Sequence, residues 1–215
     1  VIPGSWAAES PAPPETTRNV AAARQVLSGA GWSVDVDGIF SNAGRRLEAE
    51  ILVRDGQPVR VRAAQSIADQ ALECGISLTV TPSSYAADIL PRLQYPGDFD
   101  IYLGGWQWSL DPDDSDLFIS SACPSEEVPA GKNFMCWQSD TVDALLQEGR
   151  VGTLLADRAA TYADLQALRR ANRPLILLWG EPSYSLLATK FVWPTRATDV
   201  SSPLYAWSIE TWEAP

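Results

Sequence analysis

The segment from residue 98 to residue 116, DFDIYLGGWQWSLDPDDSD, carries the residues of this chain that are best suited to contact a ligand. Glycine lets a ligand approach the main chain closely, and an indole offers a broad, stiff, amphipathic face. A desolvated carboxylate can hold an ammonium group through a charge-assisted hydrogen bond. The alternating apolar residues before the two glycines predict a strand that ends where these groups begin. The segment therefore indicates a binding surface at the end of a strand.

Several kinds of catalytic and metal site are excluded because the residues that they need are absent from the sequence. The chain has no histidine, so Ser/His/Asp and Cys/His nucleophile pairs and histidine-containing zinc sites are excluded. It contains no GxxxxGK[ST] or GxGxxG phosphate loop, and DPDDSD lacks the glycine and the glutamate of a calcium loop. A glycan hydrolase that uses two of the many carboxylates is the enzymatic alternative. We expect a protein without enzymatic activity, cofactor or metal.

The net negative charge of the chain argues against two classes of partner. The chain has 16 Lys and Arg against 27 Asp and Glu, a formal net charge of −11. Such a surface repels phosphate backbones and anionic lipids, so neither nucleic acid nor a membrane surface is an expected partner. No stretch approaches the roughly 20 apolar residues that span a bilayer. We expect the chain to be a monomer.

Predicted helices and strands alternate along the sequence, and these elements must position residues 98–116. Helical spacing of apolar residues, with helix start and stop signals, covers 17–32, 58–75, 140–149 and 155–173. Strands are predicted near 46–53, 76–81, 98–104 and 174–179. The last of these, PLILLW, is continuously apolar, as is typical of a strand covered on both faces. This alternation predicts an α/β fold, a mixed sheet with helices on its faces, preceded by a proline-rich connector at 1–16.

The order of several motifs resembles a known family over nearly the whole chain, from about residue 19 to residue 212. The motifs are LSGAGW, DVDGIFSNAGRRLEAEILV, CGISLTV, YAADILPRLQYPGDFDIYLGGWQWSLDPDDSDLF, GKNFMCWQSDTVDALLQEGR and RAATYADLQALRRANRPLILLW. In this order they resemble the C-terminal lobe of the dipeptide-, oligopeptide- and nickel-binding proteins of bacterial ABC importers, extracellular solute-binding protein family 5.

The resemblance implies a fold and a function. Residues 17–215 would form the C-terminal ligand-binding lobe of a longer, two-lobed protein with a type II periplasmic-binding-protein-like fold. That protein would capture a peptide-like solute in the cleft between its lobes and deliver it to an ABC permease. Its expected location is the periplasm or the cell surface. A lobe of this type attached to a DNA-binding domain, as in some bacterial regulators, is an alternative.

The resemblance also implies site residues. Gly105, Trp106 and Gln107 would supply a backbone ledge for an extended peptide, and Tyr85 falls where the family often places an aromatic that faces the cleft. Trp106 or Trp108 would then lie on the open face beside Tyr85.

One position departs from the family pattern. Peptide binders of the family commonly read Gly-Trp, two residues, then an aspartate that holds the ligand's amino group, whereas this chain has Ser109 at that position. Either Asp111 takes over the role, or the ligand has no amino terminus to hold. Because nine tryptophans could stack on sugar rings, an oligosaccharide is the alternative ligand.

The resemblance also implies how the three cysteines are paired. Cys123 and Cys136 flank a polar loop, and members of the family often bridge the equivalent loop. A Cys123–Cys136 disulfide is therefore expected, with Cys74 free and buried at a helix end. Such a bond fits a protein exported to an oxidising compartment.

Overall fold

The computed structural model of the chain describes residues 6–8, 17–107 and 111–180. It divides into two compact units, Val1–Leu175 and Ile176–Pro215, and all described helices and strands belong to the first. The helices are α1 (Val20–Gly29), α2 (Pro58–Glu73), α3 (Leu90–Leu93), α4 (Ser115–Phe118), α5 (Asp140–Val151) and α6 (Leu155–Asn172), with single turns η1 (Tyr85–Ile89, a π-helix) and η2 (Ser120–Ala122, a 3-10 helix). The strands are β1 (Ser33–Val34), β2 (Phe40–Asn42), β3 (Arg45–Arg46), β4 (Glu48–Arg54), β5 (Ser77–Ser83) and β6 (Ile101–Leu103).

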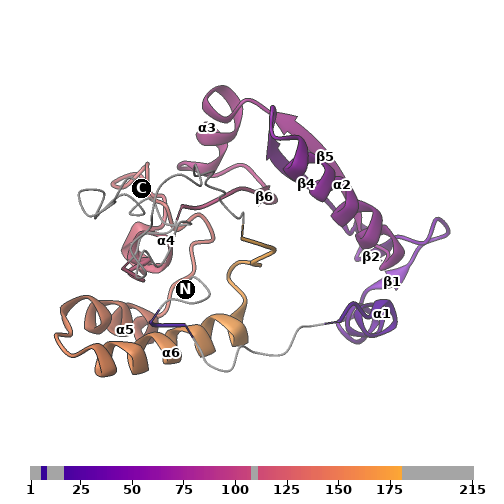
Figure 1. The fold of residues 1–215 in the computed structure, drawn as a ribbon. Helices are drawn as coiled ribbons and strands as arrows, with labels where there is room; N and C mark the ends of the chain where they lie inside the picture. Colours follow the sequence, from indigo (N-terminus) through magenta and orange to yellow (C-terminus); the bar gives the residue numbers. More distant parts are fainter. Residues whose placement is uncertain (1–5, 9–16, 108–110, 181–215) are drawn as a thin grey trace, which may run out of the picture. The chain divides into compact units, whose positions relative to one another are not determined.

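The strands form two sheets rather than one. The strands β1, β2 and β3 pair antiparallel in that order, and the order of the parallel sheet is β5-β4-β6 (Figure 1). The predicted α/β class is confirmed, with the antiparallel and parallel pairings in separate sheets. The strands predicted near 46–53, 76–81 and 98–104 correspond to β4, β5 and β6.

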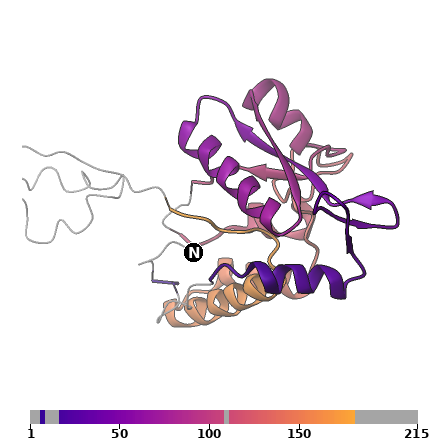
Figure 2. The ribbon, with the colours of Figure 1, turned by 90° about the vertical axis from the view of Figure 1, so that its right-hand side faces the viewer.

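The parallel sheet is the framework of the candidate site. Helix α2 packs on one face of this sheet (Figure 2). Ile51 and Val53 of β4 cluster there with Ala64 of α2. Leu52 points to the opposite face and is also fully buried. Both faces of β4 are therefore covered at its centre, which explains the unbroken apolar run ILV in its sequence.

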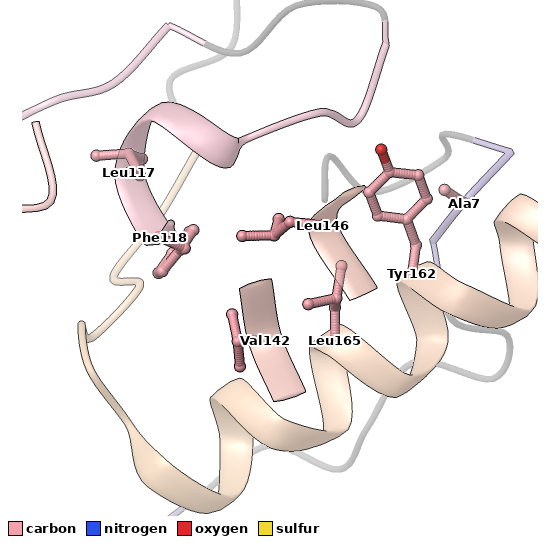
Figure 3. Packing of buried hydrophobic residues seen from close by; sticks show 7 residues of the cluster. All are labelled: Ala7, Leu117, Phe118, Val142, Leu146, Tyr162 and Leu165. Atoms are coloured by element: carbon pink, nitrogen blue, oxygen red, sulfur yellow. The ribbon is translucent and has the colours of Figure 1, made fainter. Parts of the chain in front are cut away.

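A second core lies where α4, α5 and α6 meet. Val142 and Leu146 of α5 face Leu165 of α6, and Phe118 of α4 approaches the same side chains (Figure 3). The sequence sets this packing because the apolar residues of α5 and α6 recur at helical spacing. Ala7, from the segment predicted to be a connector, is buried in this core.

The expected disulfide is present. Cys123 and Cys136 are bonded with their Cα atoms 4.7 Å apart, and Cys74 is free. Cys74 is half-buried rather than buried, contrary to the prediction. It caps the C-terminus of α2 immediately before Gly75, where the chain turns, so its side chain is not enclosed by the helix face that packs on the sheet.

The prediction of a strand at 174–179 is wrong. Within the described residues this segment pairs with no strand, and Ile176 and Leu177 are 78% and 71% exposed. An apolar run becomes a strand only when a neighbouring strand satisfies its backbone N–H and C=O groups. Composition alone could not supply that partner.

Candidate functional site

The three parallel strands end side by side at one edge of their sheet. Arg54, the last residue of β4, pairs in register with Ser83, the last residue of β5, and Val53 pairs with Leu103, the last residue of β6. Ligands of open α/β sheets bind outside the carboxyl ends of the strands. A binding site is therefore expected in the segments that follow these three strands.

The chain after β6 presents bare backbone and an indole at this edge. Residues 104–107 are all exposed, and Trp106 is 40% exposed. A Cβ atom at Gly105 would come within 2.7 Å of Arg60 Cζ, so glycine allows the Arg60 side chain to lie against this backbone. Lys132 Nζ lies 5.8 Å from the centre of the Trp106 ring, within cation–π range.

The chain after β5 places Tyr85 at the same edge. Ser84 accepts a hydrogen bond from Ala87 N (3.4 Å) and caps the turn η1, of which Tyr85 is the first residue. The Arg54 guanidinium lies 5.9 Å from the centre of the half-buried Tyr85 ring. Pro91 follows at the start of α3, where the missing N–H costs nothing.

These segments enclose a pocket of about 230 Å³. Its walls combine aromatic rings, bare backbone and a few polar groups, the composition typical of small-molecule sites. Burial raises the pKa of the Tyr102 phenol, and the nearby charges of Arg60 and Arg54 oppose that rise. The lining residues are Tyr85, Leu90, Gln94, Tyr102, Gly105, Trp106, Ala130, Gly131, Lys132 and Phe134.

The structure brings together some of the residues predicted from the sequence but not all of them. Tyr85, Gly105 and Trp106 line one pocket. Gln107 is exposed next to Trp106 and does not line the pocket. Trp108 and Ser109 lie outside the described residues.

Asp111 lies elsewhere. Both of its carboxylate oxygens accept hydrogen bonds from Arg158 Nη2, at 2.9 and 2.8 Å. Together with Asp113 and Arg150, which form an ion pair at 3.2 Å, these residues line a hollow of about 360 Å³. Although this hollow is larger than the pocket beside Trp106, its charged groups are already paired. The role of Asp111 as the anchor for a ligand's amino group stays a prediction. In that role, its carboxylate would have to release Arg158.

The carboxylates of Asp114 and Asp116, after Pro112, form ion pairs with other residues of the chain. Asp114 occupies the N-cap position of α4, but its carboxylate accepts two hydrogen bonds of 2.6 Å from Arg169 of α6 rather than capping the helix. The Arg169 guanidinium lies 3.9 Å from the centre of the Phe118 ring. Asp116 forms an exposed ion pair with Lys132 at 2.6 Å. The sequence DPDDSD is therefore a turn and helix start that ties α4 to its neighbours.

Sequence reasoning missed several residues of the pocket. Tyr102 points to the pocket from within β6, and its alternation with Ile101 and Leu103 was the available signal. Lys132 and Phe134 come from a loop whose path no local pattern indicates.

In residues 6–8, 17–107 and 111–180, no three Cys, Asp or Glu side chains gather in a way that could hold a metal ion. No helix of the same described ranges has the length and apolar character needed to cross a membrane.

Curated relatives share this chain's sequence over part of their length. The oligopeptide-binding protein AppA of Bacillus subtilis is 27% identical over 139 residues, 64% of this chain and 24% of the relative. The di/tripeptide-binding protein 4 of Pseudomonas aeruginosa is 27% identical over 145 residues, 65% of this chain and 26% of the relative. The chain thus spans about a quarter of the length of these relatives.

Solved structures agree with the fold. The structure of AppA from Bacillus subtilis in complex with a nonapeptide superposes with a TM-score of 0.71 at 24% identity, over 80% of this chain and 34% of that one. NikZ from Campylobacter jejuni in complex with Ni(L-His) gives a TM-score of 0.68 at 28% identity, over 79% of this chain and 33% of that one.

A family model provides the assignment. The model of the bacterial extracellular solute-binding proteins, family 5, middle region, matches residues 1–126, which is more than half of the chain. This family consists of binding proteins rather than enzymes, which agrees with the expectation of a protein without enzymatic activity. The chain belongs to the bacterial extracellular solute-binding proteins of family 5.

Proposed function

We propose that this chain is the ligand-binding lobe of the substrate-binding component of an ABC importer, and that its ligand is a peptide-like solute. The observation that carries the proposal is the pocket at the carboxyl edge of the parallel sheet, where Gly105 backbone, Trp106 and Tyr85 converge. An extended peptide can pair with exposed main chain and lay its side chains on aromatic faces. Two curated relatives bear names of peptide-binding proteins, which supports this ligand class.

In this proposal the ligand is held between this lobe and a second lobe. A binding site normally buries most of its ligand's surface, and a pocket of about 230 Å³ on one lobe is too small to do so alone. The isolated lobe would keep only part of the contacts while still bearing the entropic cost of association. The two-lobed protein then delivers the solute to a permease, in the periplasm or at the cell surface, where a Cys123–Cys136 disulfide persists.

The ligand class can be tested by native mass spectrometry. The full-length protein is unfolded to remove bound ligand, refolded, and offered an equimolar mixture of short peptides, cello- and malto-oligosaccharides, and Ni²⁺ with L-histidine. We expect mass increases that match peptides, because the pocket combines main-chain and aromatic surface without a cluster of ligating side chains among its described residues. Adducts of sugars alone, or of nickel alone, would contradict the peptide assignment.

A further inference from the structure

The loop of residues 124–135 has two faces. Lys132 and Phe134 line the pocket, whereas Asn133 between them is fully buried and does not line it. Met135, the next residue on the side of Asn133, packs against the core that α4, α5 and α6 form. The same short segment is therefore a wall of the pocket on one face and part of the second core on the other.

Asn133 joins this wall to the neighbouring segments through hydrogen bonds. Its Nδ2 donates to the carbonyl oxygens of Ile119 and Trp137, at 3.1 and 2.9 Å. Its Oδ1 accepts a hydrogen bond from Trp137 N at 3.2 Å, and its backbone N–H donates to the Ala122 carbonyl at 3.0 Å. The wall is thus tied on one side to the segment that follows α4 and on the other to the segment that precedes α5.

These hydrogen bonds require the carboxamide of asparagine. A carboxamide carries one acceptor oxygen and two N–H donors, which match the one N–H group and the two carbonyl oxygens around the Asn133 side chain. Aspartate would place a carboxylate against two carbonyl oxygens, and alanine would remove a partner from three backbone groups. Because buried polar groups are costly to leave unpaired, either change should displace the loop.

The other contacts of the loop restrain it at other positions. The Cys123–Cys136 disulfide joins its ends, and a Cβ atom at Gly131 would overlap the backbone of the turn η2. The ion pair of Lys132 with Asp116 is exposed and contributes little. Since Lys132 and Phe134 are the direct neighbours of Asn133, the directions of their side chains depend most on the Asn133 hydrogen bonds.

We propose that Asn133 is a positioning residue of the binding site, which holds Lys132 and Phe134 where they meet the ligand. The proposal rests on the peptide-binding function proposed above and adds a residue that the ligand does not touch. A site binds well when the side chains that contact the ligand are held in place by the residues behind them. Loss of the Asn133 side chain therefore lowers affinity by moving the wall of the pocket.

Binding is measured by calorimetry on the full-length protein with the peptide Ala-Phe-Ala-Ala. The variants are Asn133→Ala, Asn133→Ser and, as the matched control, Thr161→Val, all studied well below their unfolding temperatures. Thr161 is buried in α6 outside the pocket, and its hydroxyl forms hydrogen bonds with Glu148 and with the Asp157 carbonyl. Thr161→Val thus removes buried hydrogen bonds without touching the wall.

The position of the wall is measured without ligand by fluorine NMR of the same proteins labelled with fluorotryptophan. Lys132 Nζ lies 5.8 Å from the centre of the Trp106 ring, so the Trp106 signal responds to a movement of the wall. Trp106→Phe identifies this signal by removing it. Thiol counting under denaturing conditions confirms that the Cys123–Cys136 disulfide is intact in every variant.

We expect Asn133→Ala to weaken binding about tenfold, as loss of a supporting residue does at other sites. Thr161→Val should stay within about twofold of the wild-type affinity although it unfolds more easily. The Trp106 signal should shift in Asn133→Ala and stay in place in Thr161→Val. Asn133→Ser, whose hydroxyl can still donate to one carbonyl oxygen, should give smaller changes, and it provides the test if the alanine variant does not fold.

Three results would have other meanings. Wild-type affinity or an unshifted Trp106 signal in the folded Asn133 variants would overturn the proposal, because other contacts would then hold the wall. Equal losses of affinity in Asn133→Ala and Thr161→Val would also overturn it, because they would reflect a general loss of stability. If Ala-Phe-Ala-Ala does not bind the wild type, that result counts against the peptide-binding function, and the fluorine spectra still decide whether Asn133 positions the wall.

Discussion

Replacing Asp114 with asparagine is expected to lower the free energy of unfolding by about 3 kcal/mol. The Asp114 side chain is 1% exposed, and Arg169 is 14% exposed and bonded to both of its carboxylate oxygens. Asparagine has nearly the same shape but no charge, so it leaves the Arg169 guanidinium partly buried without its counter-ion. Urea denaturation followed by tryptophan fluorescence measures the change.

The matched control is Asp116→Asn. This substitution removes a carboxylate two residues further along, from an ion pair with Lys132 whose side chains are 51% and 68% exposed. Because solvent-exposed pairs contribute little, the loss should be about 0–1 kcal/mol. Equal losses in the two variants would contradict a structural role for the Asp114–Arg169 pair that joins α4 to α6.

Replacing Gly75 with alanine is expected to destabilise the chain by about 2–4 kcal/mol. Gly75 has φ +84°, a conformation that an L side chain rarely adopts, and it follows the end of α2. A Cβ atom there would lie 2.6 Å from Cδ2 of Phe40, which is buried, and 2.9 Å from the Gly38 carbonyl oxygen. The substitution therefore adds a steric clash to the backbone cost.

Gly44→Ala separates these two costs. Gly44 has φ +78°, and nothing lies within 4 Å of the position of its Cβ atom. Its loss should be about 1 kcal/mol, from the backbone alone. A Gly75→Ala variant no less stable than Gly44→Ala in the same denaturation experiment would show that the turn after α2 relaxes at no cost.

Much of the fold could be predicted because local periodicity and local packing agree. The helices α1, α2, α5 and α6 carry apolar residues at helical spacing, and β4 carries a run that both faces of the sheet bury. The segment 174–179 has the same kind of apolar run but lacks a paired strand within the described residues. Whether such a run becomes a strand depends on distant residues, which a local pattern does not contain.

The candidate site could be predicted in part for the same reason. Gly105 and Trp106 follow β6 directly, so the end of one predicted strand located them. Asp111 is only a few residues further, yet its carboxylate is held by Arg158, a contact between residues 47 positions apart. Proximity in sequence to Trp106 did not indicate this partner, and no spacing indicated Lys132.

The affinity of the full-length protein for a peptide identified by mass spectrometry shows whether the ligand binds on the Trp106 face of the pocket. Calorimetry is carried out on the wild type, Trp106→Ala and Trp106→Phe, with thermal unfolding to confirm that all three fold. Truncation of an aromatic that anchors a ligand costs about 2 kcal/mol, so Trp106→Ala should bind about 30-fold more weakly, and Trp106→Phe should recover part of the loss. Wild-type affinity in a folded Trp106→Ala protein would place the ligand elsewhere.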